Sequence, residues 1–211
     1  LLLDVLGATL FPDSLVQRAG LLAREARSAL TASALIGLAA AGLLAGAAPL
    51  LADGMGQALL LPLMLALAPL LPLSAFSGAA SGLALRDQRF RLLAMRVLVV
   101  QPIALLAGLV AAAAGLGAWA MVVNQGLTTS LVFLLFLLAG RVPLRPALDP
   151  AALRALWPVA GPQLASLILI MGRYRIFLLA LGFIVAESVL ALAHFAFRML
   201  DAVLMMVWQA T

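Results

Sequence analysis

Two arginine side chains, Arg173 and Arg198, lie inside long apolar stretches near the carboxyl end of the 211-residue chain. A guanidinium keeps its charge in proteins, and its fixed fork of N–H groups fits two oxygens of a phosphate. A charge in apolar surroundings is costly unless it faces other polar groups or water. The two arginines are therefore candidate ligands for an anionic head group.

Both arginines share a helix face with other polar residues. At ~100° per residue, one face of the last predicted helix carries four ionisable residues: Glu187, His194, Arg198 and Asp201. The same periodicity places four polar residues on one side of the preceding helix: Gln163, Ser166, Arg173 and Tyr174. These two faces predict one polar cavity.

A packing interpretation stays open for part of this set. Arg198 and Asp201 are three residues apart and can neutralise each other, and Arg173 with Arg175 could extend toward the membrane surface. For His194 we favour packing. For Arg173 and Arg198 we favour binding, because both lie several residues from the ends of their helices. Glu187, His194 and Asp201 are then candidates for charge pairing or ion coupling.

A smaller polar patch comprises Asn124, Gln125, Thr128 and Thr129. Amides and hydroxyls in apolar helices often bond to a neighbouring helix. The patch therefore either joins two helices or lines the same cavity, and both interpretations stay open.

The elements that position these residues are membrane spans. Residues 97–140 contain no charged side chain, whereas arginines cluster before and after them. These 44 residues would extend about 66 Å as helix, roughly twice the ~30 Å hydrocarbon core. The segment therefore crosses a membrane twice. Both arginine clusters then lie on one face, which the positive-inside rule makes the cytoplasmic face.

Composition supports a membrane protein and excludes several other classes. The chain is 66% hydrophobic and 10% charged, with a mean hydropathy of +1.20. All 13 basic residues are arginines in loops or spans, so the net charge of +5 sets topology and does not indicate nucleic-acid binding. With no cysteine, one histidine and no phosphate-binding loop, we expect no metal, no cofactor and no enzymatic activity.

The predicted fold is an all-α helical bundle of about seven spans. The amino-terminal bundle covers residues 1–140, with spans at about 1–16, 28–51, 58–82, 93–114 and 117–139. A cytoplasmic linker follows at 141–157, where Asp149 could cap a short helix over residues 150–156. A second bundle begins at 158–211, with spans at about 158–182 and 188–209. Because the chain starts and stops inside apolar runs, we expect it to be a fragment.

Three details of the spans can be tested. Asp53 should lie in the outward-facing turn after the first complete span. The glycines of Gly42-Leu-Leu-Ala-Gly46 should allow close helix packing. Four prolines inside spans should kink them: Pro62, Pro69, Pro72 and Pro102.

Four short motifs resemble a known family when taken in order. They are Leu15-Val-Gln-Arg18, Arg89-Phe-Arg-Leu-Leu-Ala94, Gly115-Leu-Gly-Ala-Trp-Ala120, and Arg145-Pro146 with Leu153-Arg154. The chain resembles the polysaccharide-transporter branch of the multidrug, oligosaccharidyl-lipid and polysaccharide exporter superfamily, the oligosaccharide flippases. The resemblance implies two bundles of about twelve to fourteen spans in total, of which this chain would hold the second to the eighth.

The resemblance also implies an activity. Flippases of this kind carry a polyprenyl-diphosphate-linked oligosaccharide across the bacterial inner membrane by alternating access around a cationic cavity. The resemblance also implies polysaccharide assembly proteins as possible partners. Arg173 and Arg198 fit such a cavity. Many relatives have an aspartate near the middle of the seventh span, where this chain has Arg173-Tyr-Arg175, and this leaves ion coupling open.

Two other functions compete with a flippase. A drug or metabolite exporter of the same superfamily would need an acidic cavity for cationic substrates. A membrane-embedded glycan polymerase or glycosyltransferase would need catalytic carboxylates or large outer loops, whereas the outer turns hold only Asp53 and Glu187.

Overall fold

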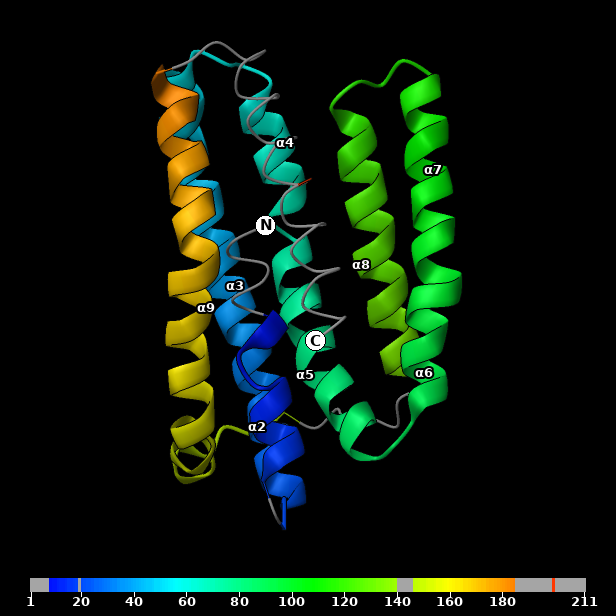
Figure 1. The fold of residues 1–211 in the computed structure, drawn as a ribbon, viewed down its shortest axis with the longest axis vertical. Helices are drawn as coiled ribbons and strands as arrows, with labels where there is room; N and C mark the ends of the chain where they lie inside the picture. The colour runs from blue at the N-terminus through cyan, green and yellow to red at the C-terminus, as the bar shows by residue number, and fades with distance from the viewer. Residues whose placement is uncertain (1–7, 19, 140–145, 185–198, 200–211) are drawn as a thin grey trace. The chain divides into compact units, whose positions relative to one another are not determined.

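The computed structural model describes residues 8–18, 20–139, 146–184 and 199, and its regular elements there are all helical. They are α2 (Pro12–Gln17), α3 (Ala23–Met55), α4 (Leu60–Leu67), α5 (Leu70–Arg86), α6 (Phe90–Met95), the π-helical turn η1 (Arg96–Val100), α7 (Gln101–Ala113), α8 (Trp119–Ala139) and α9 (Pro150–Ile184) (Figure 1). The chain divides into two compact units, Leu1–Leu167 and Ile168–Thr211. The contacts described below lie within the first unit.

Four segments of the described chain are long and apolar enough to cross a membrane: Ala23–Met55, Leu60–Arg86, Phe90–Ala113 and Trp119–Leu138. The prediction of an all-α polytopic membrane protein is confirmed. The four complete spans predicted before the linker agree with these segments to within about five residues. The half-span predicted at 1–16 is described only from residue 8, and it ends with α2.

Of the four prolines expected to kink spans, one lies between two helices and the other three lie close to the start of a helix. Pro69 separates α4 from α5, so the expected kink is an interruption between two helices. Pro62 and Pro72 are the third residues of α4 and α5, where a backbone N–H has no intrahelical partner to lose. Pro102 is the second residue of α7, which continues without a break from the π-helical turn η1. Because it cannot donate to the carbonyl four residues earlier, the helix is locally widened there.

The first outer turn lies later in the chain than predicted. Asp53 is part of the last turn of α3, which ends at Met55. Gly56 adopts the left-handed conformation, with a φ of 64°, and the Gln57 N–H donates to the Ala52 carbonyl at 3.0 Å. This is the usual geometry of a helix ending at glycine. The expected hairpin is present, but Asp53 lies before its turn.

The glycines that allow close packing are not the predicted pair. A Cβ placed on Gly42 or Gly46 would meet nothing within 4 Å, so that prediction is wrong. A Cβ on Gly37 of α3 would lie 2.6 Å from the Pro72 Cα and 2.8 Å from the Leu71 carbonyl oxygen of α5. Gly82 of α5 meets the backbone of Pro12 in the same way, at 2.6 Å. Glycine is therefore required where α3 and α2 cross α5.

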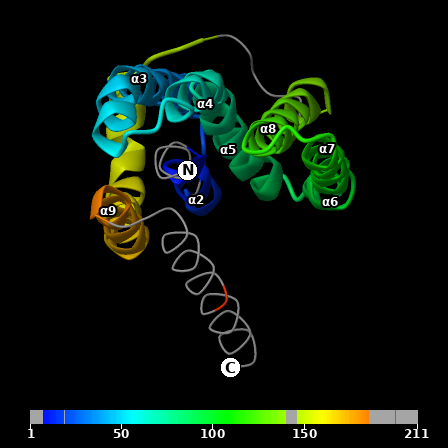
Figure 2. The ribbon, with the colours of Figure 1, turned by 90° about the horizontal axis from the view of Figure 1, so that it is seen from above.

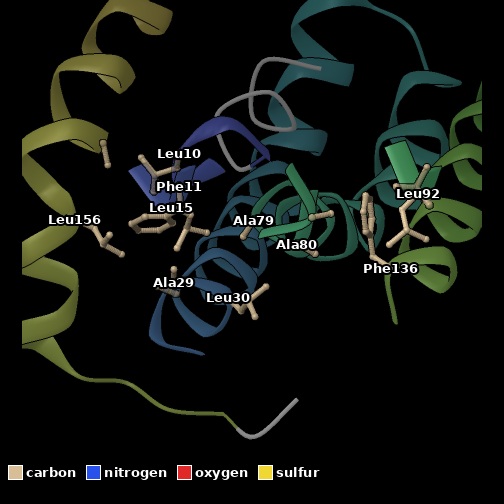
Figure 3. Close-up of a cluster of buried hydrophobic side chains, with 14 of the residues drawn as sticks. Leu10, Phe11, Leu15, Ala29, Leu30, Ala79, Ala80, Leu92, Phe136 and Leu156 are labelled. Carbon is tan, nitrogen blue, oxygen red and sulfur yellow. The ribbon is translucent and has the colours of Figure 1, made fainter. Parts of the chain in front are cut away.

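The core draws buried side chains from α2, α3, α5, the beginning of α9, and α6, η1 and α8 (Figures 2 and 3). It combines many alanines with a few large side chains, of which Leu15, Phe136 and Leu156 are almost completely buried. Leu156 comes from α9 and packs with the α2 residues of this cluster. Large apolar side chains on the outer faces are exposed, as expected for surfaces that contact lipid.

The linker differs from the prediction. The short helix expected at 150–156 and the span expected from residue 158 form one helix, α9, which runs through Pro158 and Pro162. Proline is tolerated inside membrane helices because neighbouring groups can satisfy the freed carbonyls. The predicted cap is confirmed, since Asp149 Oδ1 accepts a hydrogen bond of 3.0 Å from the Ala151 N–H.

Candidate functional site

Most of the predicted site lies outside what the structure describes. Glu187, His194, Arg198 and Asp201 fall outside the described residues. Arg173 and Tyr174 lie in α9, of which only the backbone is described there. The anionic-ligand site and the coupling residues stay predictions.

Two residues of the polar face predicted on the helix of Arg173 are described with their side chains, Gln163 and Ser166. Gln163 is partly buried on α9, and its Nε2 donates to Asp13 Oδ2 of α2. Ser166, three residues further along α9, is exposed. The sequence analysis did not single out Asp13. Its place inside the span predicted at 1–16, where an ionisable residue is costly, is the feature that could have drawn attention to it.

The patch on α8 connects two helices. Asn124 Nδ2 donates to the Ala104 carbonyl of α7 at 3.2 Å, and its Cβ lies opposite Gly108. Thr128 donates to the Asn124 carbonyl at 2.8 Å. Gln125 is partly buried and Thr129 is buried. Asn124 therefore joins two helices, which was one of the two interpretations of the patch. The other interpretation, that the patch lines a cavity, stays a prediction.

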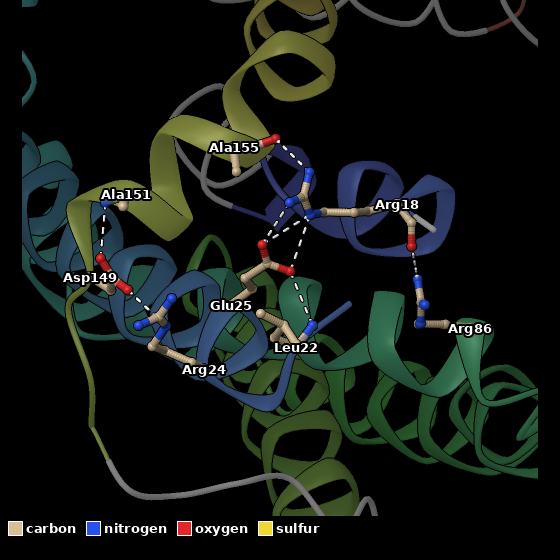
Figure 4. Close-up of polar contacts among 8 residues, drawn as sticks. All are labelled: Arg18, Leu22, Arg24, Glu25, Arg86, Asp149, Ala151 and Ala155. Atoms are coloured by element: carbon tan, nitrogen blue, oxygen red, sulfur yellow. Dashed lines mark hydrogen bonds and ion pairs between the residues drawn. The ribbon is translucent and has the colours of Figure 1, made fainter. Parts of the chain in front are cut away.

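The main polar cluster joins α2, α3 and α9 at the end where the arginines lie (Figure 4). Arg18 follows α2, and its Nη2 and Nε donate to Glu25 Oε1 at 2.8 and 3.0 Å. Arg18 Nη1 also donates to the Ala155 carbonyl of α9 at 3.2 Å. The Glu25 carboxylate, which accepts these hydrogen bonds, raises the pKa of Arg18 above its ordinary value.

Glu25 is buried, with 4% of its surface exposed. Its Oε2 accepts a hydrogen bond of 3.0 Å from the Leu22 N–H, at the start of α3. A carboxylate three residues into a helix satisfies a free backbone N–H and interacts favourably with the helix dipole. The predicted spans at 1–16 and 28–51 left residues 17–27 as the loop between them, and Glu25 was not singled out, although it is the single acid among three arginines of that loop.

A second ion pair fixes the beginning of α9. Arg24 Nε of α3 lies 2.9 Å from Asp149 Oδ2, while the other oxygen of Asp149 caps α9. The Asp149 N–H donates to Ser28 Oγ, and the Ala147 N–H donates to Thr31 Oγ1, both at 3.2 Å. Both hydroxyls belong to α3. Side chains from two successive turns of α3 therefore bind the residues that lead into α9.

Arg86, in the last turn of α5, completes the cluster. Its Nη1 donates to the carbonyls of Leu15 and Arg18 at 2.8 and 2.6 Å. A cation is favourable at the carboxyl end of a helix, where the carbonyls lack intrahelical partners. The arginines that the sequence analysis used to set topology thus also connect helices of the first unit.

Comparison with protein families gives a match to nearly the whole chain. A family model described as polysaccharide biosynthesis protein covers residues 2–211. Comparisons with curated proteins and with solved structures gave no match. The family match includes all four apolar segments that are long enough to cross a membrane. The chain therefore belongs to the polysaccharide biosynthesis protein family.

Proposed function

We propose that the protein translocates a lipid-linked oligosaccharide or polysaccharide precursor across the bacterial inner membrane by alternating access, without catalysing a chemical reaction. The observation that carries the proposal is the match of residues 2–211 to a polysaccharide biosynthesis family in a chain built from membrane-spanning helices. A polytopic protein of such a pathway has a direct task at the membrane, because a sugar cannot cross the hydrocarbon core unaided.

The arrangement of polar groups supports a transporter. The described arginines and carboxylates concentrate at one end of the helices, where they join α2, α3, α5 and α9. The Arg24–Asp149 pair is largely exposed, so this contact can form and break at low cost as helices move. The diphosphate of the carrier lipid would bind Arg173 and Arg198, and the lipid chains would remain in the bilayer.

The test uses the full-length gene product in lipid vesicles that contain a labelled polyprenyl-diphosphate oligosaccharide. Translocation is read as the labelled sugar that becomes accessible to a glycosidase outside the vesicles. Arg173→Gln and Arg198→Gln should reduce the rate to that of empty vesicles, because glutamine cannot neutralise a diphosphate. Arg91→Gln is the matched control, since Arg91 is an exposed residue of α6, and it should keep the rate of the unmodified protein.

The same vesicles separate the competing functions. Normal rates in both cavity variants would refute the role of the arginines. Efflux of a cationic dye without glycan translocation would indicate an exporter of drugs or metabolites. A change in glycan length would indicate a polymerase or glycosyltransferase.

A further inference from the structure

The beginning of α9 carries an exposed aromatic side chain, Trp157. The residue is 56% exposed, whereas Leu156 and Ala160 on the opposite side of the helix are almost completely buried in the core. Arg18 also bonds to the Ala155 carbonyl. The backbone beneath Trp157 is therefore held in place while its side chain stays accessible. Phe90 on α6 is the other exposed aromatic residue of the described part of the chain.

The indole of Trp157 lies flat against Gly161, one turn further along α9. A Cβ placed on Gly161 would lie 3.2 Å from both Cε2 and Nε1 of Trp157 and 3.6 Å from its Cδ1. Distances so similar to three atoms of the five-membered ring place this position over the face of the ring, because a position beside its edge would be much farther from one of the three. One face of the indole therefore covers Gly161, and the opposite face is free for a ligand.

Arg154 lies one turn before Trp157 and is also exposed. Residues three apart on a helix are neighbours, with about 5–6 Å between their Cβ atoms. Three other arginines at this end, Arg18, Arg24 and Arg86, bind groups on other segments. Arg154 makes no hydrogen bond or ion pair within the described part of the chain. Its guanidinium is therefore available beside the free face of the indole.

An aromatic face beside a guanidinium fits a sugar that is joined to a phosphate. A sugar ring has a face of C–H groups, which packs on the electron-rich face of an aromatic ring while the hydroxyls at its edge stay in water. A guanidinium binds phosphate oxygens through its fork of N–H groups. The lipid-linked glycan of the proposed function contains both groups side by side, because its first sugar is attached to the diphosphate.

We propose that Trp157 and Arg154 form a docking subsite for the sugar and diphosphate of the lipid-linked glycan at the cytoplasmic end of α9. The inference rests on the proposed transport function, which it extends by naming where the head group first binds. Trp157 stacks on the sugar ring and Arg154 binds the diphosphate before the head group passes to Arg173 and Arg198. No covalent bond forms or breaks at this subsite.

Tryptophan and arginine also occur at membrane surfaces as contacts to lipid head groups. The match to a polysaccharide biosynthesis family favours the sugar as the ligand of this pair. A bilayer-free measurement separates the two ligands, because a lipid anchor has no reason to bind a soluble glycan.

The first experiment measures binding to the full-length protein in detergent. The probe is the labelled oligosaccharide diphosphate of the vesicle assay without its lipid chain. Trp157→Ala should weaken probe binding about tenfold through loss of stacking. Gly161→Leu keeps the tryptophan but fills the space beneath its ring, so it should weaken binding as well. Phe90→Ala is the matched control and should bind the probe as the unmodified protein does.

A second probe, the same oligosaccharide without its diphosphate, isolates the role of the arginine. Arg154→Gln should weaken binding of the diphosphate probe about fivefold and binding of the neutral probe less than about twofold. Arg91→Gln removes an exposed arginine of α6 and should change neither value. Equal losses for the two probes in Arg154→Gln would overturn the assignment of Arg154 to the diphosphate.

The vesicle assay separates this inference from the transport function. Trp157→Ala should raise the glycan concentration needed for half the maximal rate about tenfold and leave the maximal rate unchanged. Unchanged probe binding by Trp157→Ala would overturn the docking subsite while normal translocation still supported the transport function, and Trp157 would then be a lipid contact. If no variant moves glycan but probe binding depends on Trp157 and Arg154, the transport function fails and the docking subsite stands.

Discussion

The two halves of α3 are built for different surroundings. The inner half carries Glu25, Ser28, Ser33 and Gly37, all buried against neighbouring helices. The outer half exposes large apolar side chains, with Leu43 at 68% and Leu50 at 76% exposure, and buries small alanines along the side that meets α4 and α5. One helix is thus anchored at one end by polar bonds and close backbone contact, and faces lipid at the other. Substitutions should be costly at the buried positions of the inner half and nearly neutral on the exposed face of the outer half.

The largest difference in stability between the two halves should follow from replacing one glycine in each half by leucine. Gly37→Leu places a side chain against the backbone of Pro72 and Leu71, so α3 and α5 must move apart, at a cost of about 1–3 kcal/mol or more. Gly42→Leu extends into open space and should change stability by less than about 0.5 kcal/mol. Thermal unfolding in detergent measures both, and equal losses would contradict the difference between the halves.

A smaller effect should follow from removing one acid at each end of α3. Glu25→Gln keeps the size of the side chain but loses the charge that binds Arg18 and Leu22. We expect a loss of about 1–2 kcal/mol, because Glu25 is buried but Arg18 is partly exposed. Asp53→Asn is the matched control at the exposed outer end. Equal midpoints of thermal unfolding for the two variants would show that the Arg18–Glu25 pair does not stabilise the inner half.

The smallest effect concerns the bond between α3 and the start of α9. Asp149→Ala removes the cap of α9 and the ion pair with Arg24, which should cost about 1 kcal/mol. Arg24→Gln removes only the ion pair, and because Arg24 is 62% exposed it should cost at most about half as much. Protection of the first amides of α9 from hydrogen exchange distinguishes the two variants. If Arg24→Gln exposes these amides as much as Asp149→Ala, the ion pair contributes more than the cap.

Hydropathy and loop charge predicted the four complete spans because length and solvation alone determine where a membrane helix can lie. Glycine spacing failed at Gly42 and Gly46, since spacing does not reveal which face meets another helix. The break expected at Pro158 is absent, because membrane helices can continue through proline. Asp13 and Glu25 were missed for a different reason. Their partners, Gln163 and Arg18, are fixed by tertiary contacts that no short sequence window contains.

The π-helical turn η1, at Arg96–Val100, has a consequence for how this sequence can change during evolution. A π turn accommodates one residue more than an α turn over the same rise. Deletion of one residue there would restore an ordinary turn and would keep the register of α7 against α8, including the Asn124 bond to Ala104. This turn is therefore a position inside a membrane span where the chain can lose a residue without realigning the helix that follows.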